Sequence, residues 1–313
     1  MLISIVIPVY NRAEMVKETL DSVSRQTHRP LHVVLVDNNS TDNSLAVLQE
    51  FKKQHETHDF KIDVLSEAKA GACAARNAGA RLVDSEWLMF FDSDDTMDEC
   101  LVAKYVEKIA ECGGNVDVVT TDADFNENGK VSRVRFARSN FFENHIFHSN
   151  LSTQRYIMRR ELLERAGGWN ETVQCWNDWE LGVRVLLQNP RVAVVDDGVY
   201  VHVRVHNESI TGAKYSQNPQ RKELAIATAI KAVEQSDFKG KERFVKLLKM
   251  RRFVLAGLFL NEGENELAQR YYDESYDAVK EDCRLKWLAP MVYRYVGCGG
   301  RGIDRLIRWV VKD

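Results

Sequence analysis

Short apolar runs alternate with helix-period segments over the first 121 residues of the chain. The apolar runs predict strands, and segments with apolar residues three or four positions apart predict the helices between them. Strands that are apolar on both faces are typical of a parallel sheet covered by helices on each side. The predicted strands are 3–7, 31–36, 62–65, 87–91 and 116–120, and the predicted helices are 13–25, 42–54, 72–84 and 98–112.

The pattern changes after residue 121. Residues 122–155 are polar and mixed, and we expect loops with irregular strands there. Further along, the pattern predicts helices at 159–166 and 178–188, a strand at 191–196, and then a helical tail with segments at 225–233, 243–260 and 265–279. We therefore expect an α/β protein with a mostly parallel sheet flanked by helices over residues 1–215. A helical C-terminal extension over 216–313 is expected to pack on it.

Composition indicates a folded protein with no general affinity for nucleic acid. Hydrophobic residues make up 44% of the chain, and the net charge of −3 lacks the basic character of nucleic-acid-binding proteins.

The six cysteines form no CxxC pair, which argues against a zinc site or a disulfide framework and favours the cytosol. The apolar start of the chain is too short for a signal peptide. We also find no apolar run long enough to span a membrane.

Three carboxylates follow the fourth predicted strand directly: Asp92, Asp94 and Asp95, with Ser93 between them. In parallel sheets, ligands bind beyond the carboxyl ends of the strands. Three neighbouring acids repel each other unless a cation is present, and Mg²⁺ and Mn²⁺ prefer carboxylate oxygens together with substrate phosphates. Asp94 or Asp95 also fits the N-cap of the next helix. From these residues alone, metal binding and helix capping are equally supported, and the same residues can do both.

The first two strands end in polar residues at the same edge of the predicted sheet. Tyr10 follows the first strand and can stack on a nucleobase, whereas Asp37 ends the second strand and can accept hydrogen bonds from base N–H groups. Residues 40–42, Ser-Thr-Asp, more readily cap the helix that begins near Asn43.

Small residues open the third predicted helix, at 69–79. Gly71 and its neighbours let a ligand approach the backbone closely, with Arg76 and Asn77 one turn further on. The segment is neither the GxxxxGK[ST] phosphate loop nor the GxGxxG dinucleotide fingerprint. P-loop ATPase and dinucleotide-dependent dehydrogenase functions therefore lose their main support.

An aspartate lies among tryptophans at the start of the helix predicted at 178–188. Trp176 and Trp179 offer faces suited to sugar C–H groups, and Asp178 can take a proton from an attacking hydroxyl. The alternative, given equal weight, is a helix N-cap at Asp178 with both tryptophans in the core.

Residues 200–206 alternate with period two, which predicts His202, Arg204 and His206 on one face of a strand. Guanidinium pairs with phosphate and imidazole binds transition metals, so this face suits a diphosphate. For His202, a solvated position is favoured.

Taken in chain order, five motifs resemble those of the family 2 glycosyltransferases, inverting enzymes of the GT-A fold. The resemblance spans residues 2–212 and rests on the motifs at 5–11, 36–42, 75–79, 91–95 and 176–181. It implies metal-dependent transfer of a sugar from a nucleotide diphosphate donor to a hydroxyl on a saccharide or lipid-linked acceptor, in polysaccharide or glycan assembly. The implied donor is a UDP-sugar, with thymine and guanine left open as the base.

The resemblance also implies roles for individual residues. Asp178 is the expected general base, Asp94 and His206 are the expected ligands of Mn²⁺ or Mg²⁺, and Trp176 and Trp179 are expected to bind the acceptor. The family often has Glu-Asp where this chain has Asn-Asp, which leaves the aspartate in place. The expected nucleotide-sugar-binding residues are Pro8, Tyr10, Asn11, Arg12, Asp37, Asn39, Gly71, Arg76, Asn77, Asp92, Ser93, Asp94 and Arg204.

Two other functions remain open at this point. A sugar-phosphate nucleotidyltransferase also uses acid pairs on an α/β sheet, with Arg12 as its candidate triphosphate contact, but it leaves Asp178 without a role. A non-catalytic carbohydrate-binding protein would not need these aspartates. The basic amphipathic stretch 301–312 can touch an anionic bilayer at the inner face of the membrane, although packing within the protein is favoured about two to one.

Overall fold

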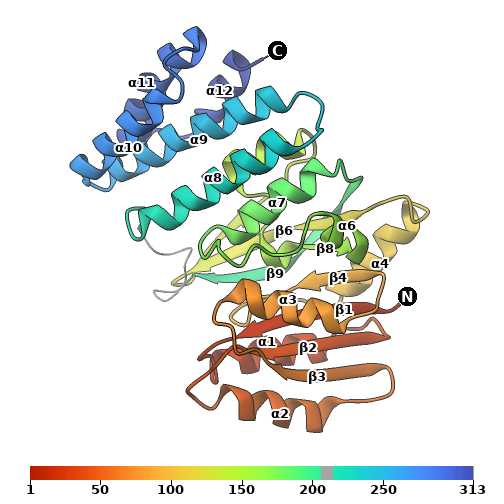
Figure 1. Ribbon diagram of the computed structural model, residues 1–313. Helices are drawn as coiled ribbons and strands as arrows, with labels where there is room; N and C mark the ends of the chain where they lie inside the picture. The colour runs from red at the N-terminus through yellow and green to blue at the C-terminus, as the bar shows by residue number, and fades with distance from the viewer. Residues whose placement is uncertain (206–213, 313) are drawn as a thin grey trace.

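The computed structural model describes residues 1–205 and 214–312, which form a central sheet covered by helices (Figure 1). The strand order is β3-β2-β1-β4-β8-β6-β9-β5, with β7 paired to β6. In the first half every pairing is parallel, as predicted. There β1 (Ile3–Val9) lies between β2 (Leu31–Asp37) and β4 (Trp87–Phe90), and β3 (Phe60–Ser66) borders β2.

The helices between these strands lie where the pattern predicted them: α1 (Met15–Ser24), α2 (Ser44–His55), α3 (Ala72–Leu82) and α4 (Leu101–Glu111). Every residue of β1 and β2 is buried. Side chains of a strand alternate between its two faces. Accordingly, Val6 joins the hydrophobic cluster on one face of the sheet, while Ile5 and Ile7 join the cluster on the other.

The second half of the sheet is mixed. β8 (Tyr156–Arg159) runs antiparallel to both β4 and β6 (Val118–Glu127), whereas β6 and β9 (Val192–Val205) are parallel. The short β5 (Thr96–Met97) pairs antiparallel with the far part of β9. β9 therefore reaches back to the acidic segment that follows β4.

Residues 122–155 contain more regular structure than the predicted loops and irregular strands. β6 continues to Glu127 and forms a hairpin with β7 (Lys130–Val134), and a 3₁₀ turn covers Thr153–Arg155. A helix, α5 (Phe141–His148), is also present and was missed. It is short, and helices of this length depend on tertiary packing rather than on local propensity.

The predicted helical tail is confirmed. It follows α6 (Arg160–Arg165) and α7 (Asn177–Leu187), and Figure 1 shows α8 lying beside α7. Residues of the tail share one hydrophobic cluster with α3, α5 and α7. In residues 1–205 and 214–312, no helix is both long and apolar enough to cross a membrane. The tail comprises α8 (Pro219–Gln235), α9 (Lys241–Asn261), α10 (Asn265–Asp277), α11 (Cys283–Gly297) and α12 (Asp304–Val310).

Candidate functional site

The loops that follow β1 and β2 are joined by hydrogen bonds at the carboxyl edge of the parallel strands. The backbone N–H of Asn11 donates to the Ser40 hydroxyl at 3.1 Å, and the Asn11 side chain accepts from the Thr41 N–H at 2.8 Å. Asp42 accepts from the N–H of Ser44, the first residue of α2, and also from the N–H of Ala13. Asn43 is the N-cap of α2, so residues 40–42 do not occupy the cap position, although Asp42 accepts from the first N–H of the helix.

Asp37 ends β2 with a side chain that is only 4% exposed. Its Oδ2 accepts from the Ser40 N–H at 3.3 Å, whereas its buried Oδ1 has no hydrogen-bond partner among the described residues. A buried acceptor without a partner is unfavourable, so Oδ1 would gain from a ligand donor that displaces the atoms now covering it. Tyr10 lies just beyond Val9, which is in register with Asp37, and is exposed, whereas Pro8 is buried within β1.

Asn38, which the sequence analysis did not single out, holds the loop that follows β3. Its side-chain amide donates to the carbonyl oxygens of Glu67 and Lys69 at 2.9 and 2.8 Å, and its Oδ1 accepts from the Gly71 N–H at 2.7 Å. Gly71 has φ +122°, which side chains rarely tolerate. Asn39 donates to the Ala68 carbonyl. Both amides therefore position this loop beside Asp37.

Arg76 of α3 contacts the acidic segment after β4 and the start of α7. Its Nη2 donates to Asp92 Oδ1 at 2.7 Å, and its Nη1 donates to Asn177 Oδ1 at 3.4 Å. The guanidinium carbon also lies 4.4 Å from the ring centroid of Trp169. Residues far apart in the sequence, including the neighbour of Asp178, thus meet around one buried cation.

Asn77 has both ends of its amide engaged within the protein. Its Nδ2 donates to the Trp169 carbonyl at 2.9 Å and to Glu171 at 2.8 Å, and its Oδ1 accepts from the Trp169 N–H. The side chain thereby fixes the loop that leads to α7. These contacts give Asn77 a structural role in addition to the predicted role in binding the nucleotide sugar.

The three carboxylates after β4 have different surroundings. Asp95 is almost fully buried and accepts from Gln154 Nε2 at 2.5 Å and from the Arg204 N–H at 2.8 Å. Burial raises the pKa of Asp95, and the charges of Asp92 and Asp94 raise it further. Asp95 therefore serves to anchor β9 and the 3₁₀ turn, and it does not cap α4, whose N-cap is Cys100. Asp92 and Asp94 are left as the candidates for ligand contact.

Arg204 of β9 holds the acidic segment from its other side. Its Nε donates to the Asp94 carbonyl, its Nη1 donates to Glu18 at 2.5 Å, and its Nη2 donates to the Met15 carbonyl at 3.3 Å. The predicted alternation holds over 201–205, because Val201 and Val203 are buried while His202 and Arg204 are partly exposed. His202 pairs with Asp98, in line with its predicted solvated position. His206 lies outside the described residues.

Asp178 is the second residue of α7, one position after Asn177. Its Oδ1 accepts from the Trp179 N–H at 2.8 Å, so it satisfies a first-turn donor although the N-cap is Trp176. Burial raises the pKa of Asp178, the Trp179 hydrogen bond opposes this, and the charge of Asp92 raises it again. This electrostatic influence indicates that the acidic segment and Asp178 border the same region.

The two tryptophans have different environments. Trp179 is 1% exposed, and its indole N–H points at the carbonyl oxygens of His145 and Ile146, at 3.1 and 3.2 Å. A ring with no exposed face cannot bind a sugar, so the prediction of an acceptor contact at Trp179 is wrong and the core alternative is right. Trp176 is half-buried, and the guanidinium carbon of Arg251 lies 5.0 Å from its ring centroid.

Tyr156, at the start of β8, is a candidate that the sequence analysis missed. It is 1% exposed, and its hydroxyl has no hydrogen-bond partner among the described residues. Burial raises the pKa of Tyr156, with a further contribution from Asp178. The hydroxyl is therefore a buried polar group whose ionisation responds to the charge of the predicted base. The sequence analysis missed Tyr156 because it did not predict that a strand, β8, begins at this residue.

The described residues contain no group of three or more His, Cys, Asp or Glu side chains arranged to hold a metal ion. Mg²⁺ and Mn²⁺ commonly bind proteins through only one or two carboxylates, with substrate phosphates completing the coordination. Asp92 and Asp94 fit that mode. Burial raises the pKa of Asp92, Arg76 lowers it, and the charge of Asp94 raises it, a repulsion that a bound cation would relieve.

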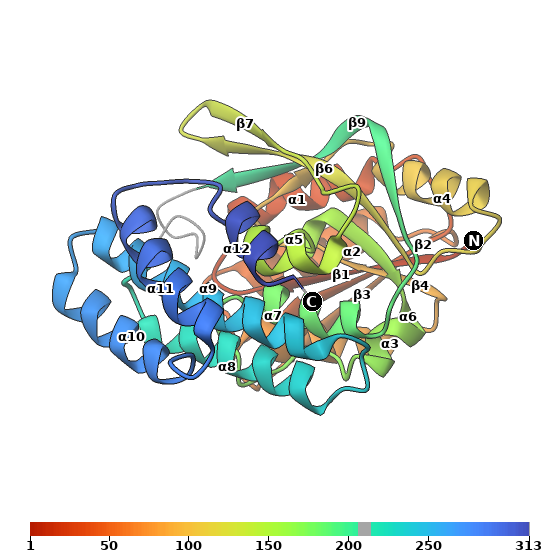
Figure 2. The same cartoon turned by 90° about the horizontal axis from the view of Figure 1, so that it is seen from above.

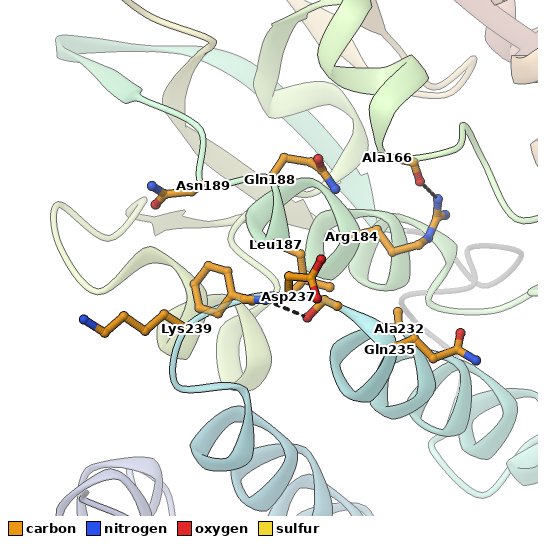
Figure 3. Close-up of a pocket in the computed structure, with 11 residues that line it drawn as sticks. Ala166, Arg184, Leu187, Gln188, Asn189, Ala232, Gln235, Asp237 and Lys239 are labelled. Atoms are coloured by element: carbon orange, nitrogen blue, oxygen red, sulfur yellow. Dashed lines mark hydrogen bonds between the residues drawn. The ribbon is translucent and has the colours of Figure 1, made fainter.

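A cleft of about 760 Å³ opens at the other end of α7 (Figure 3). It is lined by Leu187, Gln188 and the turn between α8 and α9. Arg184 reaches its wall, but this guanidinium already pairs with Glu180 and donates to the carbonyl oxygens of Ala166 and Gly168. Leu187 lies nine residues beyond Asp178, a rise of about 13 Å along the helix, so this cleft is distinct from the predicted site.

Solved structures share this architecture. TarS 1-349 from S. aureus superposes with a TM-score of 0.72 at 18% identity, covering 99% of this chain and 90% of that one. The mannosyltransferase PcManGT from Pyrobaculum calidifontis superposes with a TM-score of 0.61 at 17% identity, covering 99% and 83%. The predicted fold class is confirmed: the sheet flanked by helices is of the GT-A type.

Sequence relatives point to the same group of proteins. The chain is 25% identical over 227 residues to the uncharacterized glycosyltransferase EpsJ of Bacillus subtilis, covering 68% of this chain and 64% of the length of EpsJ. It is 28% identical over 212 residues to the PGL/p-HBAD biosynthesis glycosyltransferase of Mycobacterium tuberculosis, covering 66% and 77%. The sequence model of glycosyl transferase family 2 matches residues 4–176, more than half of the chain. The chain therefore belongs to the family 2 glycosyltransferases.

Proposed function

We propose that this protein transfers a sugar from a nucleotide diphosphate donor to a hydroxyl acceptor, with inversion at the anomeric carbon and Asp178 as the general base. The main support is the contact of Arg76 with both Asp92 and Asn177, which joins the acidic segment to the residue next to Asp178. Fold relatives were solved with UDP-GlcNAc and with GDP-Man and Mn²⁺. These relatives support a nucleotide-sugar donor here.

The nucleobase is proposed to bind at the ends of β1 and β2. The unpaired Oδ1 of Asp37 accepts a base N–H, and the exposed ring of Tyr10 stacks on the base. Uracil and thymine each carry one imide N–H that suits a single carboxylate oxygen, and the fold relative solved with UDP-GlcNAc favours a UDP-sugar. Gly71, held by Asn38, lets the donor approach the backbone of the loop after β3.

Asp178 is proposed to accept the proton of the acceptor hydroxyl as its oxygen attacks the anomeric carbon. The attack comes from the face opposite the diphosphate, so one displacement inverts that carbon. A general base works best when its pKa lies near the working pH, and burial raises the pKa of Asp178 toward that range. Trp176, half-buried beside it, is the proposed contact for a saccharide acceptor.

Asp94 is proposed as the ligand of a divalent metal, with Asp92 supporting it and His206 as a second ligand from outside the described residues. Bound at Asp94, Mn²⁺ or Mg²⁺ would supply positive charge that stabilises the departing diphosphate. Arg76 is proposed to keep Asp92 ionised and turned toward this region through their 2.7 Å hydrogen bond.

The catalytic domain is proposed to cover residues 1–215, with residues 216–313 as an extension packed on it. Two contacts support this arrangement. The cluster shared by α7, α8 and α9 leaves no separate core for the tail, and Glu262 of the tail accepts from the backbone N–H of Tyr215, the last residue of the proposed domain.

Substitution of the base tests this function. After a thermal-shift screen of nucleotide sugars with Mn²⁺ identifies the donor, we expect Asp178→Asn to bind it normally but to turn over about two to four decades more slowly. Donor affinity is measured by calorimetry and turnover by release of the nucleoside diphosphate. Asp84→Asn, an exposed aspartate before β4, is the matched control. Near-normal turnover in Asp178→Asn would remove this residue from the role.

A further inference from the structure

Helix α11 has apolar residues on two of its faces. Leu285, Leu288 and Val292 are buried against the rest of the tail. On the other face, Trp287, Met291 and Tyr295, spaced four residues apart, are 76%, 51% and 46% exposed. A helix on the surface of a soluble domain usually turns charged residues outward. The outward apolar face of α11 is therefore unusual and indicates a binding surface.

Helix α12 continues this surface. Ile307 and Val311 are buried, so most of its apolar residues pack within the protein, as the sequence favoured for 301–312. Trp309 and Leu306 nevertheless face outward, at 66% and 37% exposed. In Figure 2 both helices lie over the other elements with nothing in front of them, and in Figure 1 both lie at the end of the molecule opposite α2.

Basic residues predominate among the charges of α11 and α12. Between residues 283 and 312 the chain has seven basic residues and a single acid, although the whole protein has a net charge of −3. The acid, Asp304, is buried and paired with Arg308 and His148. The exposed basic side chains that remain are Arg284, Lys286, Arg294, Arg301, Arg305 and Lys312.

We propose that α11 and α12 form a peripheral docking surface for an anionic lipid bilayer. Exposed Trp and Tyr side chains are amphipathic and partition into the interface between lipid headgroups and acyl chains. Basic side chains among them are attracted to anionic headgroups, and the two effects add. A protein partner would be expected to bury its apolar contacts behind a mixed polar rim, whereas this surface alternates aromatic and basic residues throughout.

Vesicle flotation tests the proposal without relying on enzymatic activity. The full chain is expected to float with vesicles of equal parts phosphatidylglycerol and phosphatidylcholine, and to remain at the bottom with phosphatidylcholine alone. The double substitution Trp287→Ser with Trp309→Ser is expected to lower partitioning about tenfold, because apolar area is lost. Arg294→Glu is expected to lower it about fivefold or more, because each basic residue contributes to attraction.

Matched controls lie away from this surface. Leu82→Ser removes an exposed apolar side chain from α3, and Lys53→Glu reverses an exposed charge on α2. Both are expected to bind as the unsubstituted protein does. Failure of the unsubstituted protein to bind anionic vesicles, or full binding by the tryptophan variant, would overturn the proposal. A homodimer detected by light scattering, and lost in the tryptophan variant, would also overturn the proposal. The surface would then bind a second copy of the chain. Transfer of sugar to a water-soluble acceptor is measured in a separate assay. A failure of vesicle binding can therefore be distinguished from a failure of the proposed catalytic function.

Discussion

Arg76 donates a hydrogen bond to Asp92 at 2.7 Å, from the helix after β3 to the segment after β4. Both side chains influence the pKa of Asp178, where Asp92 raises it and Arg76 lowers it. The pair therefore contributes to the electrostatic surroundings of the proposed base, after burial and the Trp179 hydrogen bond. Its loss should be visible in both stability and activity.

Arg76→Ala is expected to destabilise the protein by about 2 kcal/mol. The substitution leaves Asp92 half-buried without its cation and removes the contact with Asn177, and such losses are costly in partly buried sites. Urea unfolding followed by circular dichroism measures the change. Arg81→Ala, on the same helix but exposed, is the control and should change stability by less than about 0.5 kcal/mol. Equal stability of the two variants would mean that the pair contributes little.

Asp178→Asn is expected to stabilise the protein at neutral pH while it lowers turnover. Because burial raises the pKa of Asp178 above 3.8, the folded state holds this proton more tightly than the unfolded state does. Its contribution to stability therefore falls as pH rises from 3.8 through the folded-state pKa. Asparagine retains an oxygen for the Trp179 N–H and carries no charge. Melting temperatures at several pH values measure the effect, and a lower melting temperature for Asp178→Asn at neutral pH would contradict it.

Much of the parallel half of the sheet was predictable because strands buried on both faces require nearly continuous apolar runs. Ile3–Val9 and Leu31–Asp37 meet that requirement, and ligands bind beyond the ends of such strands. The rule alone was enough to single out Asp37 and the acidic segment. Pairings across the edge, such as Arg76 with Asp92, were not predictable, because the direction of a side chain at a strand end depends on tertiary contacts.

The tryptophans illustrate the same limit. Trp176 and Trp179 are three residues apart, a spacing that puts both on one face of a continuous helix. Trp176, however, precedes the helix in a left-handed conformation, with φ +57°, and its ring packs against the border of the core, where it stays partly exposed. Non-glycine residues seldom adopt this conformation, so no local pattern predicts it. The sequence therefore could not distinguish the two rings, of which Trp179 is buried and Trp176 is partly exposed.

Tyr156→Phe is expected to leave stability unchanged or slightly higher but to lower turnover about tenfold. A buried hydroxyl without a partner is itself unfavourable, so its removal costs little stability. The charges of Asp178 and Asp92 both raise the pKa of Tyr156, which suggests the hydroxyl as a candidate for the proposed site. Tyr105→Phe is the matched control, because the Tyr105 hydroxyl is equally buried but belongs to the hydrophobic cluster on the other face of the sheet. A similar loss of turnover in both variants would indicate a general packing effect.

Arg251 of α9 links the tail to the proposed catalytic turn, because its guanidinium lies over Trp176 two residues before Asp178. Burial lowers the pKa of Arg251, and the described residues offer it no carboxylate, so the ring of Trp176 is its principal contact. Arg251→Met keeps most of the packing but removes the cation–π interaction, which is worth roughly 1–2 kcal/mol in a desolvated setting.

We expect Arg251→Met to lower kcat about tenfold with little change in the KM of the donor, because a looser Trp176 turn positions Asp178 less accurately. Arg251→Lys, which retains a cation over the ring, should recover part of the loss. Arg252→Met is the control, since Arg252 pairs with Glu223 instead of contacting Trp176. Steady-state kinetics on the four proteins decides the matter. If Arg252→Met loses as much kcat as Arg251→Met, the tail acts only through overall stability and not through the turn that carries Asp178.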